Sequence, residues 1–288
     1  MIGITLALLS AATSAIAVVI VGKHSKESKA FNVSLLISVV GLAILWPLAI
    51  VFTDLTAANL EGILLFAVGG TLTPGLVRLF YYSGLKKLGT SVNSSVFSVY
   101  PLYSSLLAVF FLGEILTLNN WIGVLFVALG VVFVEASSLE NNKETKSIAR
   151  SLVFPILGGL TLGASAILRK DALNLYNAPV LGVAIANTFS FALYALILIV
   201  HKPTRKELSL KKDFRFFWIA GVGQAASWVL SFYALSLQEV SVITPLLSME
   251  PLFVALFAYV YLREIEKVSV KLVVSIVLTV LGVVLVTT

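Results

Sequence analysis

Two ionisable side chains stand inside apolar stretches of the sequence. Glu250 lies near the middle of Val240–Glu264, and Arg78 lies in the apolar stretch that also contains Pro74. A carboxylate at the depth of the hydrocarbon costs about 2.5–3.5 kcal/mol even on the gentler insertion scales. Pro251, which follows Glu250 directly, removes a backbone donor and weakens the helix around the acid. The sequence therefore points to a place inside a membrane where something could bind.

Each of the two groups has a functional and a structural interpretation. Glu250 could carry a proton or hold a cationic group of a substrate, or it could be a neutral or ion-paired acid that fixes helix packing. Arg78, if it faces inward, could pair with Glu250 or bind a carboxylate or phosphate through its planar fork. If it faces outward, its stem reaches the membrane interface. The residues alone leave these alternatives open.

Uncharged polar side chains mark further candidate positions. Gln224 and Trp228 are four residues apart, so they share one helical face and could present an amide and an aromatic wall. Hydrogen bonds between helices, worth about 0.6–2 kcal/mol each, explain single residues of this kind equally well. The candidate binding or coupling residues are Glu250, Arg78, Gln224, Trp228, Tyr100, Asn93, Asn187 and Tyr103. The candidate helix-breaking residues at a cavity are Pro74, Pro101, Pro245 and Pro251.

No constellation typical of an enzyme accompanies these residues. His24 and His201 lie among lysines at segment ends, where a solvated role is favoured over metal binding. The repetition of Glu114 and Glu264 at segment ends favours capping or loop contacts. We find no phosphate-cradling loop, no nucleophile with a base, and no His and Asp cluster. We expect no catalysis, no cofactor and no metal.

Composition places the chain in a membrane. It has 288 residues, of which 59% are hydrophobic and 12% charged, with a mean hydropathy of +1.04. A soluble core does not use that much apolar residue, so we predict an all-α polytopic membrane protein. The first apolar stretch has no basic leader and is expected to be a membrane helix rather than a signal peptide. The net charge of +6 lies in loops. It therefore indicates how the chain is oriented in the membrane and is not taken as a sign of nucleic-acid binding.

Ten apolar segments are long enough to be considered as membrane helices. They are Ile2–Gly22, Phe31–Phe52, Gly62–Gly84, Val92–Leu112, Leu118–Ala136, Ser151–Leu168, Ala178–Val200, Phe216–Ser236, Val240–Leu262 and Val268–Thr287. A polar linker at residues 138–150 separates residues 1–137 from residues 151–288.

The two halves repeat each other. Placing Pro101 on Pro251 also places Glu114 on Glu264, and puts Tyr100 where the second half has Glu250. A duplicated unit with five crossings must enter the membrane in opposite senses. The halves are therefore predicted to form an inverted repeat, with a substrate site near the midplane between them.

The lysines and arginines predict the orientation. Arg78 lies inside a segment, Lys271 lies at the start of the tenth, and only Arg169 and Lys170 follow an even-numbered segment. All the other lysines and arginines follow odd-numbered segments. The odd loops are therefore expected in the cytoplasm, which leaves both termini outside.

The motifs of the two halves resemble a known family. The first half carries Pro101, Gly113-Glu114, Trp121-Ile122-Gly123 and Leu129-Gly130-Val131, and the second carries Glu250-Pro251-Leu252-Phe253 and Arg263-Glu264. These motifs resemble the EamA domain of the drug/metabolite transporter superfamily, with Arg263 in place of a usual glycine. The resemblance implies ten helices in two EamA-like units, and efflux or exchange of small metabolites. It also implies a cavity lined by helices 1–4 and 6–9, peripheral helices 5 and 10, and termini inside, against the charge pattern.

The resulting functional hypothesis is a secondary active transporter. We expect a small polar metabolite, amino-acid-like by the resemblance, to cross the plasma membrane by alternating access, with a proton as the possible coupling ion. The protein would contact membrane lipid, bind no nucleic acid, and act as a monomer or homodimer. One alternative is an exchanger for phosphorylated metabolites that uses Arg78, Arg169 and Lys170. Another is a scaffold that transports nothing and binds a lipid or a partner.

Overall fold

The computed structural model describes most of the chain. The described residues are 1–24, 30–55, 58–81, 96–97, 99–137, 151–201, 204, 210–250, 252–254, 256–257 and 270–287. Regular structure within these ranges is entirely helical. The principal helices are α1 (Ile2–His24), α2 (Ala30–Phe52), α3 (Leu60–Gly70), α5 (Tyr100–Leu107), α6 (Leu118–Ser137), α8 (Val153–Leu175), α9 (Pro179–Val200), α11 (Leu210–Leu237), α12 (Val240–Leu247) and α14 (Val270–Thr287). Short π-helical segments, Thr71–Leu76 and Ala108–Leu112, continue α3 and α5.

Six helical spans within the described ranges are long and apolar enough to cross a bilayer. They are Ile2–Val21, Phe31–Phe52, Leu60–Tyr81, Val153–Leu175, Pro179–Val200 and Phe217–Leu237. Each has 20 to 23 residues, and a hydrocarbon core of about 30 Å needs about 20 residues of helix. Four apolar helices are shorter, namely Tyr100–Leu112, Leu118–Gly130, Val240–Val254 and Val277–Thr287. A backbone in hydrocarbon must satisfy its own hydrogen bonds, which explains why this sequence folds into helices. The protein is therefore a membrane protein with several apolar helices.

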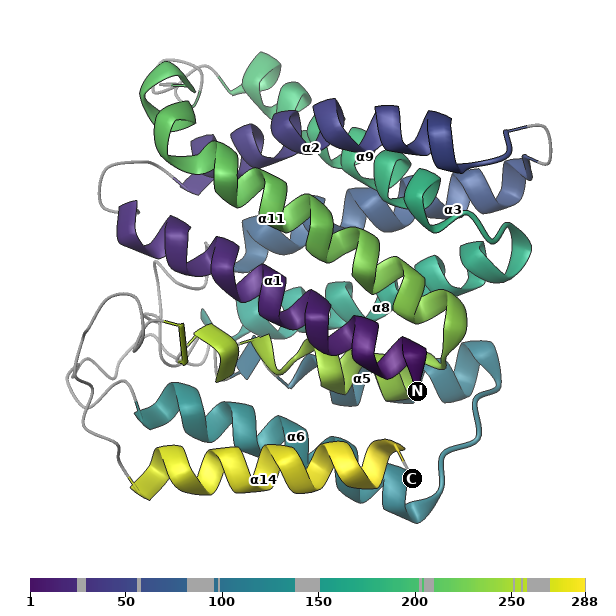
Figure 1. The fold of residues 1–288 in the computed structure, drawn as a ribbon, viewed down its shortest axis with the longest axis vertical. Coiled ribbons are helices and arrows are strands. Elements are labelled where there is room, and N and C mark those ends of the chain that lie inside the picture. Colours follow the sequence, from purple (N-terminus) through teal and green to yellow (C-terminus); the bar gives the residue numbers. More distant parts are fainter. Residues whose placement is uncertain are drawn as a thin grey trace.

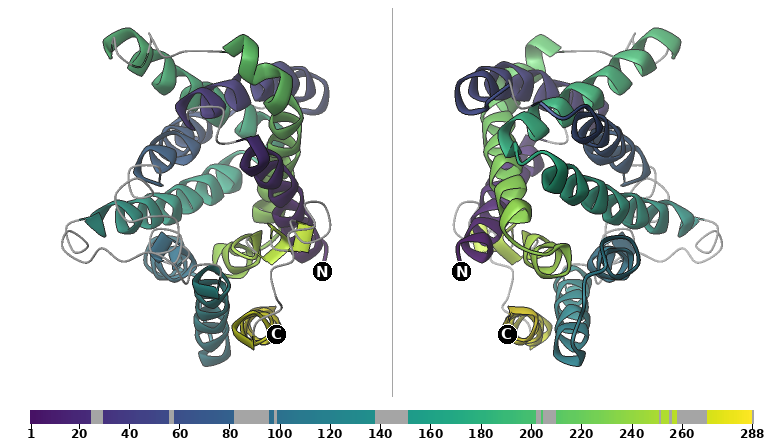
Figure 2. Two further views of the ribbon diagram at one scale, coloured as in Figure 1. Left: turned by 90° about the vertical axis from the view of Figure 1, so that its left-hand side faces the viewer. Right: turned by 90° about the vertical axis from the view of Figure 1, so that its right-hand side faces the viewer.

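The helices run side by side and form one bundle (Figure 1). α1 packs along α11, and α2 packs along α9. α6 and α14 pair with each other at one edge, as the two further views in Figure 2 also show. Their backbones come close where Gly123 faces Gly282. A Cβ added to Gly123 would lie only 2.7 Å from the Gly282 carbonyl oxygen, so this contact needs the glycine.

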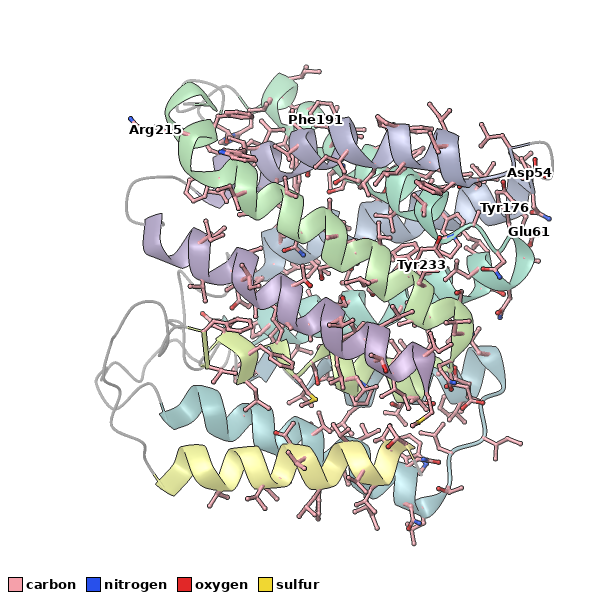
Figure 3. All side chains as sticks on the ribbon, viewed as in Figure 1. Asp54, Glu61, Tyr176, Phe191, Arg215 and Tyr233 are labelled. Atoms are coloured by element: carbon pink, nitrogen blue, oxygen red, sulfur yellow. The ribbon has the colours of Figure 1, made fainter. Side chains whose placement is uncertain are left out.

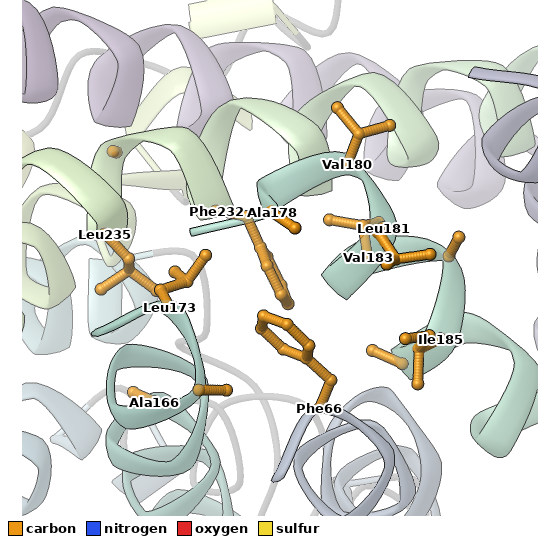
Figure 4. Close-up of a cluster of buried hydrophobic side chains, with 14 of the residues drawn as sticks. Phe66, Ala166, Leu173, Ala178, Val180, Leu181, Val183, Ile185, Phe232 and Leu235 are labelled. Atoms are coloured by element: carbon orange, nitrogen blue, oxygen red, sulfur yellow. The ribbon is translucent and has the colours of Figure 1, made fainter. Parts of the chain in front are cut away.

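A buried aromatic cluster holds the middle of the bundle together. Phe66 of α3 and Phe232 of α11 face each other with ring centroids 6.0 Å apart (Figure 4). Next to them, α3 and α9 nearly touch, since a Cβ built on Gly70 would lie 2.2 Å from Ala186 Cα. This contact requires glycine at position 70, and it holds α9 directly against α3.

The two ends of the bundle can be told apart. The chain termini lie at the same end (Figure 1), which we call the terminal end. Gly3 packs there against Gln238, and the Tyr176 hydroxyl donates to the Asp54 carbonyl at 2.7 Å. Arg215 lies at the other end (Figure 3), which we call the opposite end. α1 thus begins at the terminal end and α8 finishes there, so these corresponding helices run in opposite directions.

A predicted boundary is wrong. The sixth segment does not stop at Leu168, because α8 continues to Leu175, so Arg169 and Lys170 are helical residues and not loop residues. A hydropathy window ends a segment at the first charge, which explains the error at Leu168. The third segment is bent directly before Pro74, a predicted helix-breaking residue, since Thr73 has an extended conformation (φ −137°, ψ 121°).

Candidate functional site

The helix that carries Glu250 is interrupted directly before the acid. Ser248 and Met249 form a turn between α12 and Glu250. The Met249 amide donates to the Leu246 carbonyl at 3.2 Å, and the Leu252 amide donates to the Met249 carbonyl at 3.0 Å. Glu250 therefore sits at a break in its helix, as its neighbouring proline predicted.

The same break occurs in the first half, before Tyr100. The Val99 amide donates to the Val96 carbonyl at 3.4 Å, and the Leu102 amide donates to the Val99 carbonyl at 3.0 Å. Each of these residues stands 150 positions before its equivalent at the Glu250 break. Tyr100 and Glu250 thus occupy equivalent backbone positions in the two halves.

Both breaks face a cavity of about 490 Å³. The elements that line it are α1, α2, the π-helical segment after α3, α5, α8, α11 and α12. The lining residues are Ser10, Ala11, Ser14, Ala17, Val18, Val21, Val33, Ser34, Ile37, Thr73, Pro74, Val77, Arg78, Tyr81, Phe97, Tyr100, Leu162, Ala166, Arg169, Gln224, Ser227, Trp228, Ser231, Leu235, Thr244, Leu247, Ser248 and Glu250. α6 and α14 do not contribute, as the resemblance implied for helices 5 and 10. α9 does not contribute either, although the resemblance placed helix 7 in the wall.

Glu250 has one hydrogen-bond partner among the described residues. Ser14 of α1 donates its hydroxyl to Glu250 Oε2 at 2.8 Å. Ser10, one turn earlier on α1, forms a reciprocal pair with Ser227 of α11, with hydroxyl-to-carbonyl distances of 2.8 and 2.9 Å. The small polar residues of α1 therefore serve both close packing and the acid.

Tyr100 and its neighbours tie the two broken helices together. The Tyr100 hydroxyl donates to the Thr244 carbonyl at 3.1 Å, and the Ser104 and Thr244 hydroxyls lie 2.7 Å apart. Tyr100 also lies within electrostatic reach of both Arg169 and Glu250. The crossing of α5 with α12 therefore forms the wall of the cavity beside its charged groups.

Arg78 lines the cavity but does not pair with Glu250. Its Nη1 donates to the Ser34 carbonyl at 3.4 Å, and no salt bridge links it to Glu250. The ion pair that the sequence allowed is therefore not formed. The residue faces the bundle and not the lipid, which decides between the two orientations left open.

The other candidates divide into two groups. Gln224, Trp228 and Pro74 line the cavity. Outside its wall, the Asn187 amide donates to the Ser38 carbonyl at 2.8 Å and links α9 to α2. The other candidates outside the wall are Tyr103, Pro101 and Pro245. Asn93 and Pro251 fall outside the described residues.

Two cavity residues stand outside the main candidate set. Ser14 was not a candidate, and Arg169 was named only for the exchanger alternative and was placed in a loop. Arg169 is only 3% exposed and lies in the cavity wall. Lys170, its neighbour, points elsewhere and donates to the carbonyls of Leu235 and Gln238 at 2.8 and 2.9 Å. The apolar residues Ala172 and Leu173, which follow Arg169 and Lys170, could have indicated that the helix continues past the charges and keeps Arg169 inside the membrane.

Glu114 bonds the start of α12 at the terminal end of the bundle. Its Oε1 accepts from the Val240 amide at 2.7 Å, and its Oε2 accepts from the Ser241 amide and hydroxyl at 3.0 and 2.5 Å. Gly113 turns the chain into this position with a left-handed backbone (φ 68°). The capping role expected for Glu114 is confirmed, and the capped helix belongs to the other half. Glu264 lies outside the described residues.

The polar groups of the cavity can be stated by type. The described residues contain no group of three or more His, Cys, Asp or Glu side chains that could hold a metal ion. The polar chemistry of the cavity is that of one carboxyl, two guanidinium groups, hydroxyls, an amide and an indole.

Comparison with known proteins identifies the family. The family model described as the EamA-like transporter family matches residues 1–136 and again 149–288. The chain belongs to the EamA-like transporter family. The resemblance read from the motifs is therefore confirmed, and the chain is a membrane transporter by family.

Individual relatives agree with this assignment. An uncharacterized transporter of Archaeoglobus fulgidus is 26% identical over 263 residues, which cover 91% of this chain and 90% of the relative. A WAT1-related chloroplastic protein of Arabidopsis thaliana is 22% identical over 190 residues, which cover 64% of this chain and 46% of the relative. A solved crystal structure covers 99% of this chain and 95% of its own, with a TM-score of 0.77 and 18% identity. That likeness establishes the same fold.

Proposed function

We propose that this EamA-like protein is a secondary active transporter for a small polar metabolite, amino-acid-like in chemistry. It moves the solute across the plasma membrane by alternating access and exploits a gradient, with protons as the coupling ion. Both termini lie outside, and the protein works as a monomer or homodimer surrounded by lipid.

One observation carries the proposal, namely a cavity in the middle of the bundle that holds opposite charges apart. Its volume of about 490 Å³ falls in the range of about 300–1,000 Å³ typical of small-molecule sites. Glu250 and Arg169 both line it, and they do not form a salt bridge with each other. Charged groups inside a membrane protein usually mark substrate or ion pathways. A solute with a cationic and an anionic group matches this pair.

Alternating access is supported by the repeated architecture. We infer two units, residues 1–137 and 151–288, joined by a linker at 138–150 and related by an axis in the membrane plane. The equivalent breaks at Tyr100 and Glu250, and the opposite directions of α1 and α8, agree with this arrangement. The described cavity reaches Val21 and Tyr81 toward the opposite end, while Glu114 bonds α12 at the terminal end.

Transport into liposomes tests the proposal. Purified protein would be reconstituted, and uptake of the twenty labelled amino acids measured with and without an imposed proton gradient. Inorganic phosphate and glucose 6-phosphate would be included for the exchanger alternative. Movement of the phosphate compounds alone would favour that exchanger, and no movement of any solute would favour the scaffold.

Coupling through Glu250 makes a separate prediction. A proton and a cationic group of the solute compete for one carboxyl, so solute affinity in the wild type should fall as pH falls. Glu250→Gln keeps the shape and removes the titration. It should flatten the pH dependence of binding and abolish proton-driven accumulation.

The control for this change is Glu239→Gln, which alters an exposed acid at the terminal end. It should leave the pH profile of the wild type in place. An unchanged profile in Glu250→Gln would mean that the acid is structural and that coupling occurs elsewhere.

A further inference from the structure

Arg169 is a buried cation, and most of its donors have no acceptor in the part of the chain that the structure describes. It lies on α8, is 97% removed from solvent contact, and borders the cavity. Its Nε donates to the Ser165 carbonyl at 3.0 Å. No described residue accepts a hydrogen bond from its two Nη groups, and none forms a salt bridge with it. A guanidinium has five N–H donors, and four of those of Arg169 have no acceptor among the described residues.

Two aromatic rings lie against this guanidinium. Its carbon atom lies 5.1 Å from the centroid of Trp228 and 5.6 Å from the centroid of Phe232. Both distances are within the range of about 6 Å in which a cation is attracted to the face of a ring. The rings and the Ser165 carbonyl together hold the side chain in one orientation. Its fork is therefore set before any ligand arrives, which lowers the cost of ordering it on binding.

A desolvated charge of this kind needs a counter-charge. Removing an ion from water costs several kcal/mol unless a partner of opposite charge or good hydrogen bonds compensate. The rings compensate only in part, because they offer no acceptor to the Nη groups. Neither Glu250 nor Glu114 forms a salt bridge with Arg169: Glu250 accepts a hydroxyl bond from Ser14, and Glu114 accepts from the Val240 and Ser241 amides.

We propose that Arg169 binds the carboxylate of the transported solute, with its guanidinium clamped by Trp228 and Phe232. The inference rests on the proposed function and adds the chemical class that the cavity requires. A carboxylate accepts two parallel N–H bonds from the planar fork. Glu250 in the same cavity disfavours a phosphate dianion through like-charge repulsion, so a monocarboxylate that also carries a cationic group fits best.

Pairs of an amino acid and its amide test this directly, because the two differ in the carboxylate and little else. Binding of each pair, such as L-phenylalanine and L-phenylalaninamide, would be measured by thermal shift on the purified chain and by tryptophan fluorescence. We expect the wild type to bind at least one acid about ten- to a hundredfold more tightly than its amide. Arg169→Gln should bring acid and amide to equal affinity, and Arg169→Lys should keep an intermediate preference because it loses the fork but not the charge.

Arg215→Gln is the matched control. It removes the same charge from an exposed arginine at the opposite end (Figure 3), and it should keep the preference of the wild type. Equal affinity for every acid and amide in the wild type, or absence of binding, would overturn the inference without any variant. So would an Arg169→Gln protein that folds and still prefers the acid. Acid-selective binding without transport would instead contradict the proposed function and leave Arg169 as a carboxylate site.

Discussion

Replacing Glu114 by glutamine removes the charge that caps α12 while it keeps the length of the side chain. In the wild type, one carboxylate accepts two backbone amides and one hydroxyl, at 2.7, 3.0 and 2.5 Å. The amide of glutamine has a single acceptor oxygen, and its NH₂ group must face one of those donors. One buried N–H of α12 therefore loses its partner.

The magnitude follows from these contacts. A hydrogen bond to a charged group contributes about 1.5–3 kcal/mol, and a buried donor without a partner costs about 1–3 kcal/mol. The interaction of the acid with the positive end of the helix contributes a further 0.3–1 kcal/mol or so. Because these contributions overlap, we expect Glu114→Gln to lower the free energy of unfolding by about 2–4 kcal/mol. Ser241→Ala removes only the hydroxyl bond and should cost about 1 kcal/mol.

Unfolding by SDS in mixed micelles, followed by tryptophan fluorescence, measures both changes. The double variant should be less destabilised than the sum of the single ones by about 0.5–1 kcal/mol, since both affect the same bond and the saving cannot exceed the cost of Ser241→Ala. Glu61→Gln is the control: this acid is exposed in the first turn of α3 and makes only the interaction with the helix end. Equal losses for Glu114→Gln and Glu61→Gln, or strictly additive effects with Ser241→Ala, would refute the reasoning.

Three further outcomes follow from packing and charge. Gly70→Ala should destabilise the fold by about 1–3 kcal/mol or more, because the added Cβ meets the backbone of Ala186 at 2.2 Å. Gly69→Ala, whose added Cβ has its nearest contact at 3.5 Å, should be tolerated. Similar unfolding midpoints for the two variants would contradict the close contact of α3 and α9. Lys170→Met should leave the two carbonyls of Leu235 and Gln238 without their donor. It should lower the free energy of unfolding by about 1–3 kcal/mol in the same assay. A midpoint equal to that of the wild type would mean that water replaces the ammonium. A reporter fused after Thr288 should be found outside the cytoplasm. Because the chain has no cysteine, labelling of a single introduced thiol can check the side of the membrane independently. A cytoplasmic signal in both assays would overturn the charge-based orientation.

The sequence alone determined the class of the protein and the position of its helix breaks. Hydrophobic content and segment length require helices in a bilayer, because a backbone in hydrocarbon has no other way to satisfy its polar groups. A proline removes a backbone hydrogen bond, and breaks are found next to Pro101 and Pro251, before Tyr100 and Glu250. The same prediction is wrong for Pro245, which lies inside the continuous helix α12. The repetition of motifs was likewise enough to identify the family, which the comparison confirmed.

The tertiary structure decided which polar residues share the cavity. Arg169 looked like a loop cation because hydropathy penalises any charge, yet Trp228 and Phe232 from another helix cover it. Asn187 borders a small hollow that Gln224 and Trp228 share with the main cavity, and its amide bonds the Ser38 carbonyl. The partner of Glu114 stands 126 positions later in the chain. These outcomes depend on how helices rotate and cross, and helix periodicity restricts a residue to a face without saying which neighbour that face meets.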